Sequence, residues 1–221
     1  MSHVNIHDID LNELKLAKVG KVVKLLYKKE PLQLVTSKMY APFGVKVQNN
    51  DYSSYTKCHL DCSLNQNNST VSVKYREALE ALDQKIAELI KEHVHLFNIK
   101  ETIDYDNYYT PVLKENKSYP KLMKITLPRD RNGNFDFVVF NENKEKMPLD
   151  DNNIEQTLSK GKIFKGIVEF SKVWFFKGKF GVMMNLVQMK FIERETATED
   201  PTEVENTSSK NIYNNNLMLD D

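Results

Sequence analysis

Hydrophobic and polar residues alternate along much of the chain, and this pattern predicts β-strands. In residues 54–64, SYTKCHLDCSL, every second side chain from Thr56 to Leu64 falls on one face, while Lys57, His59 and Asp61 fall on the other. A period of two is typical of a strand that is buried on one face only. Comparable patterns predict strands in 21–29, 32–47, 108–115, 119–128, 135–140, 161–170, 172–176 and 180–192.

The hydrophobic period changes between Tyr75 and Phe97, where it predicts one long helix. Apolar residues recur there at spacings of three and four: Leu79, Leu82, Ile86, Leu89, Ile90, Val94 and Phe97. Such spacing is typical of an amphipathic helix, here of about six turns.

These elements together predict a mostly β fold with one long helix (α+β). The Asn132-Gly133 pair predicts the turn of a hairpin between 119–128 and 135–140. A small closed or partly open barrel is the expected architecture, because closure limits exposed strand edges. Residues 1–19 are polar and weakly patterned, and we interpret them as an N-terminal extension.

The net charge of zero hides a difference between the body of the chain and its last residues. Residues 195–221 carry seven acids and one base, a net of −6. Because the whole chain has 31 basic and 31 acidic residues, the other 194 carry 30 bases and 24 acids, a net of +6. We therefore expect a mildly basic domain over 20–194 and a disordered acidic tail over 195–221.

Several classes of protein are disfavoured by what the sequence lacks. It has no run of about 18 apolar residues, so no membrane span is expected. The first ten residues, MSHVNIHDID, do not resemble a signal peptide, and two cysteines do not suggest a disulfide scaffold, so a reducing compartment is expected. No P-loop, G-x-S-x-G, G-x-G-x-x-G or carboxylate cluster supports an enzyme, and we expect no cofactor.

Two groups of potential metal ligands are better explained as structural residues. On a strand, Cys58 and Cys62 point to one side, while His59 and Asp61 point to the other, so they cannot converge on one ion. His93 and His95 are two residues apart on the expected helix, whereas a shared face needs a spacing of three or four. We interpret both cysteines as small core residues.

The segment from Val168 to Phe191, VEFSKVWFFKGKFGVMMNLVQMKF, combines aromatic and basic residues and holds the only tryptophan. On a strand, Lys172, Trp174 and Phe176 share one face, and the following turn presents Lys177 and Lys179. Aromatic rings beside lysines suit single-stranded nucleic acid, because each stacked base contributes about 1–3 kcal/mol and lysines bind phosphates. The alternative is that these rings belong to the core.

This segment is also the basis of a family resemblance. Together with 40–47, 57–64, 78–90 and 119–128, residues 166–190 resemble the single-stranded DNA-binding proteins of nucleocytoplasmic large DNA viruses, the OB-fold proteins of phycodnaviruses and giant viruses. Positions of the family pattern are occupied by Trp174, Phe175, Gly178, Lys179, Phe180, Gly181, Gln188 and Lys190. Met183 and Met184 depart from it, since a second aromatic residue is frequent there.

The resemblance implies an OB-fold-like small barrel that coats single-stranded DNA, without sequence preference, during viral replication, recombination or repair. It implies location in the host cytoplasm, at viral factories, or in the nucleus, with packaging in the virion and self-association as further expectations. The acidic tail is expected to recruit viral replication proteins. A protein–protein interaction module or a virion structural protein without nucleic-acid binding is the alternative.

The candidate DNA-binding residues follow from the strand pattern and the resemblance. The stacking candidates are Trp174 and Phe176, with Phe180 and Tyr40 as secondary candidates. The candidates for phosphate contacts are Lys124, Arg129, Lys172, Lys177, Lys179 and Lys190.

Deleting residues 195–221 is expected to raise the affinity for single-stranded DNA, because the deletion removes six net negative charges from a basic protein. Fluorescence anisotropy of a labelled oligo-dT at low salt measures the effect. Equal affinity of the full-length and shortened chains would refute the prediction.

Overall fold

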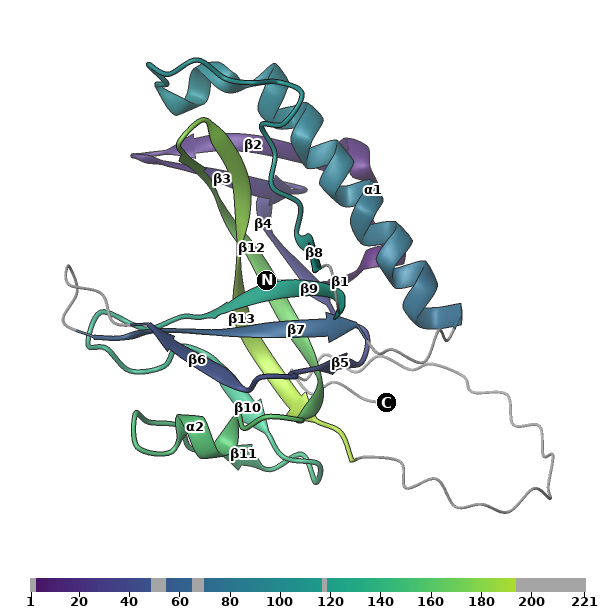
Figure 1. The fold of residues 1–221 in the computed structure, drawn as a ribbon, viewed down its shortest axis with the longest axis vertical. Helices are drawn as coiled ribbons and strands as arrows, with labels where there is room; N and C mark the ends of the chain where they lie inside the picture. The colour runs from purple at the N-terminus through teal and green to yellow at the C-terminus, as the bar shows by residue number, and fades with distance from the viewer. Residues whose placement is uncertain (1–2, 49–54, 65–69, 117–118, 194–221) are drawn as a thin grey trace.

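The computed structural model describes residues 3–48, 55–64, 70–116 and 119–193 (Figure 1). The expected acidic tail, residues 195–221, lies outside the described residues. No helix in the described part of the chain is long and apolar enough to cross a bilayer.

Five strands close into a ring, which gives a barrel of the OB-fold type. They are β5 (Met39–Tyr40), β7 (Lys57–Leu64), β9 (Tyr119–Leu127), β13 (Lys179–Phe191) and β12 (Ile163–Phe176). Each pairs with the next, and β12 pairs back with β5 to complete the ring. Within this ring, the β9–β13 pairing alone is parallel. The predicted mostly β, OB-fold-like architecture is confirmed.

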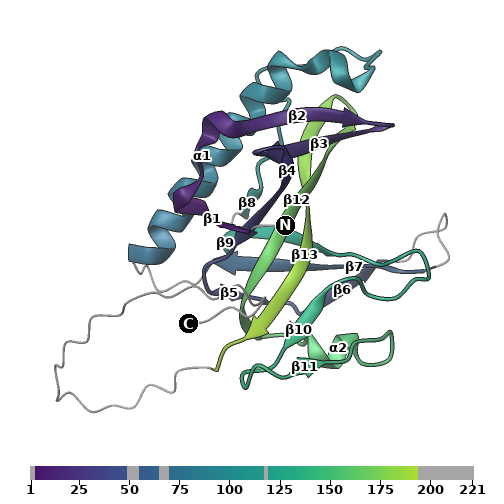
Figure 2. The ribbon, with the colours of Figure 1, turned by 180° about the vertical axis from the view of Figure 1, so that it is seen from behind.

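A second group of strands uses the other half of β12. Strands β3 (Val22–Tyr27) and β4 (Glu30–Val35) pair with each other and with β12. Strand β2 (Leu14–Val19) pairs with β3, and β1 (Val4–Asn5) pairs with β4. The 14-residue strand β12 is therefore shared between two parts of the sheet (Figure 2).

The interpretation of residues 1–19 as an extension is wrong for the described residues of that segment. Two short 3-10 helices, η1 (Ile6–Asp8) and η2 (Leu11–Glu13), lead into β2. Leu14 and Leu16 are buried in the core, and β2 pairs along all of β3. The alternation of only two buried leucines with lysines is too short to stand out in the sequence.

The predicted long helix is confirmed, although its bounds differ. Helix α1 (Thr70–Glu92) begins five residues before Tyr75, and the last predicted turn is the 3-10 helix η3 (Val94–Phe97). Its apolar stripe is buried against the core at Leu79, Leu82, Ile86, Leu89 and Ile90. Figures 1 and 2 show α1 along one side of the molecule, away from β6 (Val45–Gln48), which continues β5 along β7.

The predicted hairpin between 119–128 and 135–140 is wrong beyond a single bridge, between Arg129 and Phe135. The Asp130 carboxylate accepts hydrogen bonds from the backbone N–H groups of Asn132 and Asn134, and this wide turn directs the chain away from β9. Strand β10 (Val138–Phe140) instead pairs in parallel with β13 and antiparallel with β11 (Lys146–Met147).

The remaining elements flank the barrel. Strand β8 (Leu113–Asn116) pairs with β9, and the short helix α2 (Ile154–Thr157) follows β11. Gly44 lies against the chain that leaves α2, where a Cβ would be 2.8 Å from the backbone nitrogen of Lys160. Only glycine fits this contact, because Gly44 also has a φ of +67°.

Asp83 of α1 ties the helix to the segment that precedes β8. Its carboxylate accepts hydrogen bonds from the Tyr109 hydroxyl at 2.7 Å and from the Val112 N–H at 2.9 Å. Burial raises the pKa of the Asp83 carboxyl to about 6, and these hydrogen bonds oppose the rise only in part. The folded chain therefore binds this proton more tightly than the unfolded chain does.

The Asp83 contribution to stability is expected to be fully present below about pH 4 and to be lost as the pH rises through about 6. Asp83→Asn removes this titration. Between pH 4 and pH 7, the free energy of unfolding of the wild type should therefore fall relative to that of Asp83→Asn. Urea denaturation at several pH values measures both. Glu77→Gln, on the exposed side of the same helix, is the matched control. A difference that stays constant over this range would contradict the assignment.

Candidate nucleic-acid interface

The outer face of the barrel carries a groove across β7, β9, β13 and β12, with a volume of about 560 Å³. Direct cross-strand pairs bring its floor together: His59 lies opposite Thr126, and Thr126 lies opposite Asn185. On β12, Lys172 lies opposite Met183, so it points to the same side. The segment 110–112, next to the Asp83 contact, forms part of the wall.

The groove is basic. The cationic side chains that line it are Lys57, Lys114, Lys124, Arg129 and Lys172, and its described lining includes no Asp or Glu. None of the four lysines takes part in an ion pair among the described residues. Unpaired cations in a shared hollow provide a binding site for a polyanion.

Burial in the groove, together with the neighbouring lysines, lowers the pKa values of two groups. Partial burial lowers the pKa of the Lys124 ammonium, and Lys114 and Lys46 lower it further, although Asp61 acts in the opposite sense. Burial also lowers the pKa of His59, with Lys124 and Lys46 adding to the effect and Asp61 opposing it. Lys46 holds the Asp61 carboxylate at 2.6 Å. His59 is therefore neutral near pH 7 and offers a hydrogen bond rather than a charge.

Trp174 forms an aromatic wall of the groove. It is half-buried and lies directly opposite Gly181 on β13, with its indole ring over that glycine. A Cβ at position 181 would overlap the ring. The glycine thus allows the ring to lie on the sheet and leaves it partly accessible from the groove.

The β12–β13 turn carries three further candidates. Lys177 and Gly178 have φ values of +49° and +72°, as in a two-residue type I′ turn. Phe176 is 65% exposed, and Lys177 and Lys179 are exposed as well. Val173 is buried between Lys172 and Trp174, so the predicted alternation of β12 is present there. The roles of these residues in binding stay predictions.

Two candidates are buried and cannot contact DNA. Phe180 has no exposed surface, because its ring packs against those of Phe175 at 4.7 Å and Phe97 at 4.9 Å. Lys190 is only 6% exposed, in a part of β13 that pairs with β12 on one edge and with β10 on the other. A bulge at residue 187 also interrupts the alternation from which its outward position was predicted.

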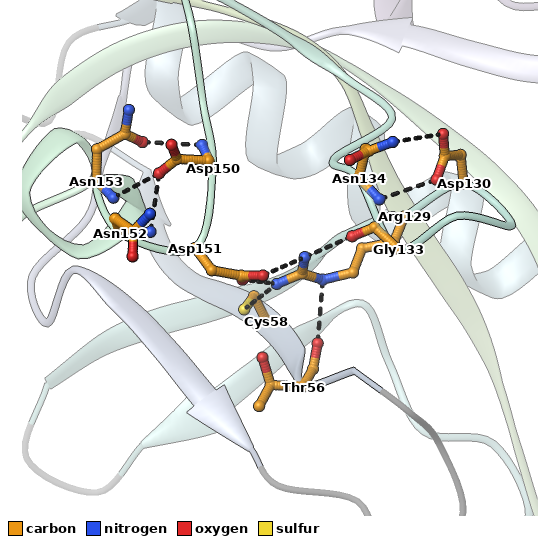
Figure 3. Close-up of polar contacts among 10 residues, drawn as sticks. All are labelled: Thr56, Cys58, Arg129, Asp130, Gly133, Asn134, Asp150, Asp151, Asn152 and Asn153. Carbon is orange, nitrogen blue, oxygen red and sulfur yellow. Dashed lines mark hydrogen bonds and ion pairs between the residues drawn. The ribbon is translucent and has the colours of Figure 1, made fainter.

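Arg129 lines the groove, but its hydrogen-bonding groups are already occupied (Figure 3). The guanidinium donates to the carbonyl oxygens of Thr56 at 3.2 Å and Gly133 at 2.6 Å, and it forms an ion pair with Asp151. Its side chain is 4% exposed and stacks on Phe135. The prediction that Arg129 is free to contact a phosphate is therefore wrong. Arg129 instead connects the loops that contain Thr56, Gly133 and Asp151.

The remaining sequence predictions concern Tyr40, the two cysteines and possible metal ligands. Tyr40 is half-buried on β5, between Ser63 and Ile163 of its neighbours, and does not line the groove. Cys58 and Cys62 are buried in the core, as predicted. No cluster of three or more His, Cys, Asp or Glu suitable for a metal occurs among the described residues.

Sequence reasoning missed most of the groove, since only four of the residues that line it were predicted as site residues: Lys124, Arg129, Lys172 and Trp174. Among the lining residues that were not predicted are Tyr55, Lys57, His59, Lys114, Thr126, Met183 and Asn185. The outward positions of Lys57 and His59 are visible in the alternation of residues 54–64. What the sequence does not reveal is that β7 and β9 lie beside the last hairpin through the parallel β9–β13 pairing.

Comparisons with known proteins give a fold likeness. No family model matches the chain. A stretch of 165 residues, 74% of the chain, is 24% identical to an uncharacterized protein, L291, of Acanthamoeba polyphaga mimivirus, and spans only 26% of that protein. The chain is also similar to solved structures of phage single-stranded DNA-binding proteins.

One of these is the protein from bacteriophage Enc34 in complex with ssDNA, with 14% identity, a TM-score of 0.45, and coverage of 83% of this chain and 97% of that one. Another is gp2.5 of bacteriophage T7, with 11% identity, a TM-score of 0.41, and coverage of 78% and 98%. Similarity at this level assigns no ligand to this chain.

Gly181→Ala is expected to displace the Trp174 ring from the sheet, because the new methyl group would occupy the space of the indole. Since Trp174 is the only tryptophan, its emission reports the change directly. We expect a red shift and stronger quenching by acrylamide, with circular dichroism unchanged. Glu77→Ala, at an exposed position of α1 outside the groove lining, is the control. Unaltered emission of Gly181→Ala would contradict the described contact.

Proposed function

We propose that this protein binds single-stranded DNA without sequence preference. The observation that carries the proposal is the groove itself: among the described residues it has four lysines without an ion pair and no lining carboxylate, and the indole of Trp174 lies over Gly181 beside them. Lysines would bind the phosphates, and the indole would stack on a base. No contact in this arrangement depends on which base is present.

The accessible indole favours single strands over duplexes. A base in a duplex is stacked on both faces and paired at its edge, so it presents no free face to Trp174. A single strand can turn its bases toward the groove. The neutral polar groups on the floor, from His59, Thr126 and Asn185, can then hydrogen-bond to base edges of different kinds.

The proposal includes a biological role for this binding. Coating of single strands during viral replication, recombination or repair, in the host cytoplasm or nucleus, is supported by the resemblance of residues 166–190 to large-DNA-virus proteins and is compatible with the mimivirus match. Recruitment of replication proteins by residues 195–221 is supported by their net charge of −6.

Substitutions in the groove separate the two kinds of contact. Lys124→Gln with Lys172→Gln is expected to reduce the salt dependence of oligo-dT binding by about 1.4 in the log–log slope, since each lost phosphate contact contributes about 0.7. Trp174→Ala is expected to weaken binding by about 1–3 kcal/mol and to leave the slope unchanged. Anisotropy of a labelled oligo-dT measures both.

The matched control is Lys74→Gln with Lys91→Gln, which removes the same charge from α1, away from the groove. It should bind as the wild type does. If the groove double variant and Trp174→Ala also bind as the wild type does, or if the wild type prefers duplex DNA, the proposed function is wrong.

A further inference from the structure

The β2–β3 hairpin lies outside the five-stranded ring, yet it continues the face that carries Trp174. Val173 of β12 is paired directly with Val23 of β3, and directly opposed residues point to the same side of a sheet. Both valines are buried, so this side is the core side. The groove face of β12, which carries Lys172 and Trp174, is therefore continuous with the outward face of β3.

The outer positions of the hairpin follow from its register. On β3 the outer positions alternate with the buried residues Val23 and Leu25. Each β2 residue that pairs with an outer β3 residue also points outward. The outer residues are Lys15, Ala17 and Val19 on β2 and Val22, Lys24 and Leu26 on β3. Figures 1 and 2 show this hairpin beside the end of β12 that is remote from β10.

This outer face has the same chemistry as the groove. It holds two lysines and no acid, and neither Lys15 nor Lys24 takes part in an ion pair among the described residues. Val19 is 54% exposed, and Phe176, on the same side of β12, is 65% exposed. Exposed apolar groups between unpaired cations suit a ligand that has both flat apolar parts and negative charges.

We propose that the outer face of β2–β3 is a second contact for single-stranded DNA, occupied by the part of the strand that leaves the groove past Trp174. The inference rests on the proposed function and extends it. Adjacent strands are about 4.8 Å apart, so β2 lies roughly 10 Å from β12. An oligonucleotide only a few residues longer than the groove reaches it.

The dependence of affinity on oligonucleotide length tests this second contact. The full-length wild type and Lys15→Gln with Lys24→Gln are titrated with labelled oligo-dT of about 4 to 20 nucleotides at several salt concentrations. For the short oligonucleotides, which fill the groove alone, both proteins should bind equally. For the long ones, the double variant should bind several-fold more weakly, with a log–log salt slope reduced by about 1.4.

The matched control lies on the other side of the same hairpin. Lys18 pairs with the buried Val23 and so points away from the outer face, and Lys28 lies in the β3–β4 turn. Lys18→Gln with Lys28→Gln removes the same charge and should leave binding to long oligo-dT at the wild-type level. Thermal unfolding of both double variants should match that of the wild type.

The outcomes separate the second contact from the groove. Equal binding of Lys15→Gln with Lys24→Gln and wild type at all lengths would overturn the inference and leave the groove proposal intact. An equal loss in the Lys18 and Lys28 control would overturn it too, because the effect would then be one of net charge. No binding of the wild type to any length would overturn both proposals.

Discussion

The ladder between β12 and β13 is the constraint on which the rest of the structure depends. It runs nearly the full length of both strands, from Phe164 opposite Phe191 to Phe176 opposite Lys179. One half of β12 closes the five-stranded ring, and the other half supports β3 and β4. Because side chains alternate across this ladder, Val173 and Phe180 enter the core while Lys172 and Trp174 face the groove. Core and candidate site are thus two faces of one pair of strands.

The electrostatics of the protein follow from which acids are already paired. Asp61 is held by Lys46, Asp151 is held by Arg129, and Asp83 is buried in contact with Tyr109 and Val112. The lysines of the groove have no such partners among the described residues, so a chain with equal numbers of acidic and basic residues still has a basic groove. Charge distribution, rather than net charge, therefore makes the outer face suitable for a polyanion.

The sequence predicts local features of this protein better than its long-range ones. The period of residues 54–64 and of α1 is strong because one face of each element is buried. Two predictions were wrong: the hairpin after β9, and an exposed position for Lys190. Both concern the parallel pairing of β10 with β13, which joins segments far apart in sequence. Arg129 was misassigned for a similar reason: its partner Asp151 lies beyond two further strands.

Photo-cross-linking tests the central claim most directly, because it shows where a bound strand lies on the full-length chain. An oligonucleotide that carries a photoreactive thymine analogue is irradiated in the complex, and the modified residues are identified by mass spectrometry. The account predicts adducts around the groove, at Trp174, Tyr55 or Met183. Adducts confined to α1, which Figure 1 shows away from β6, or to the exposed Tyr105, which does not line the groove, would contradict it.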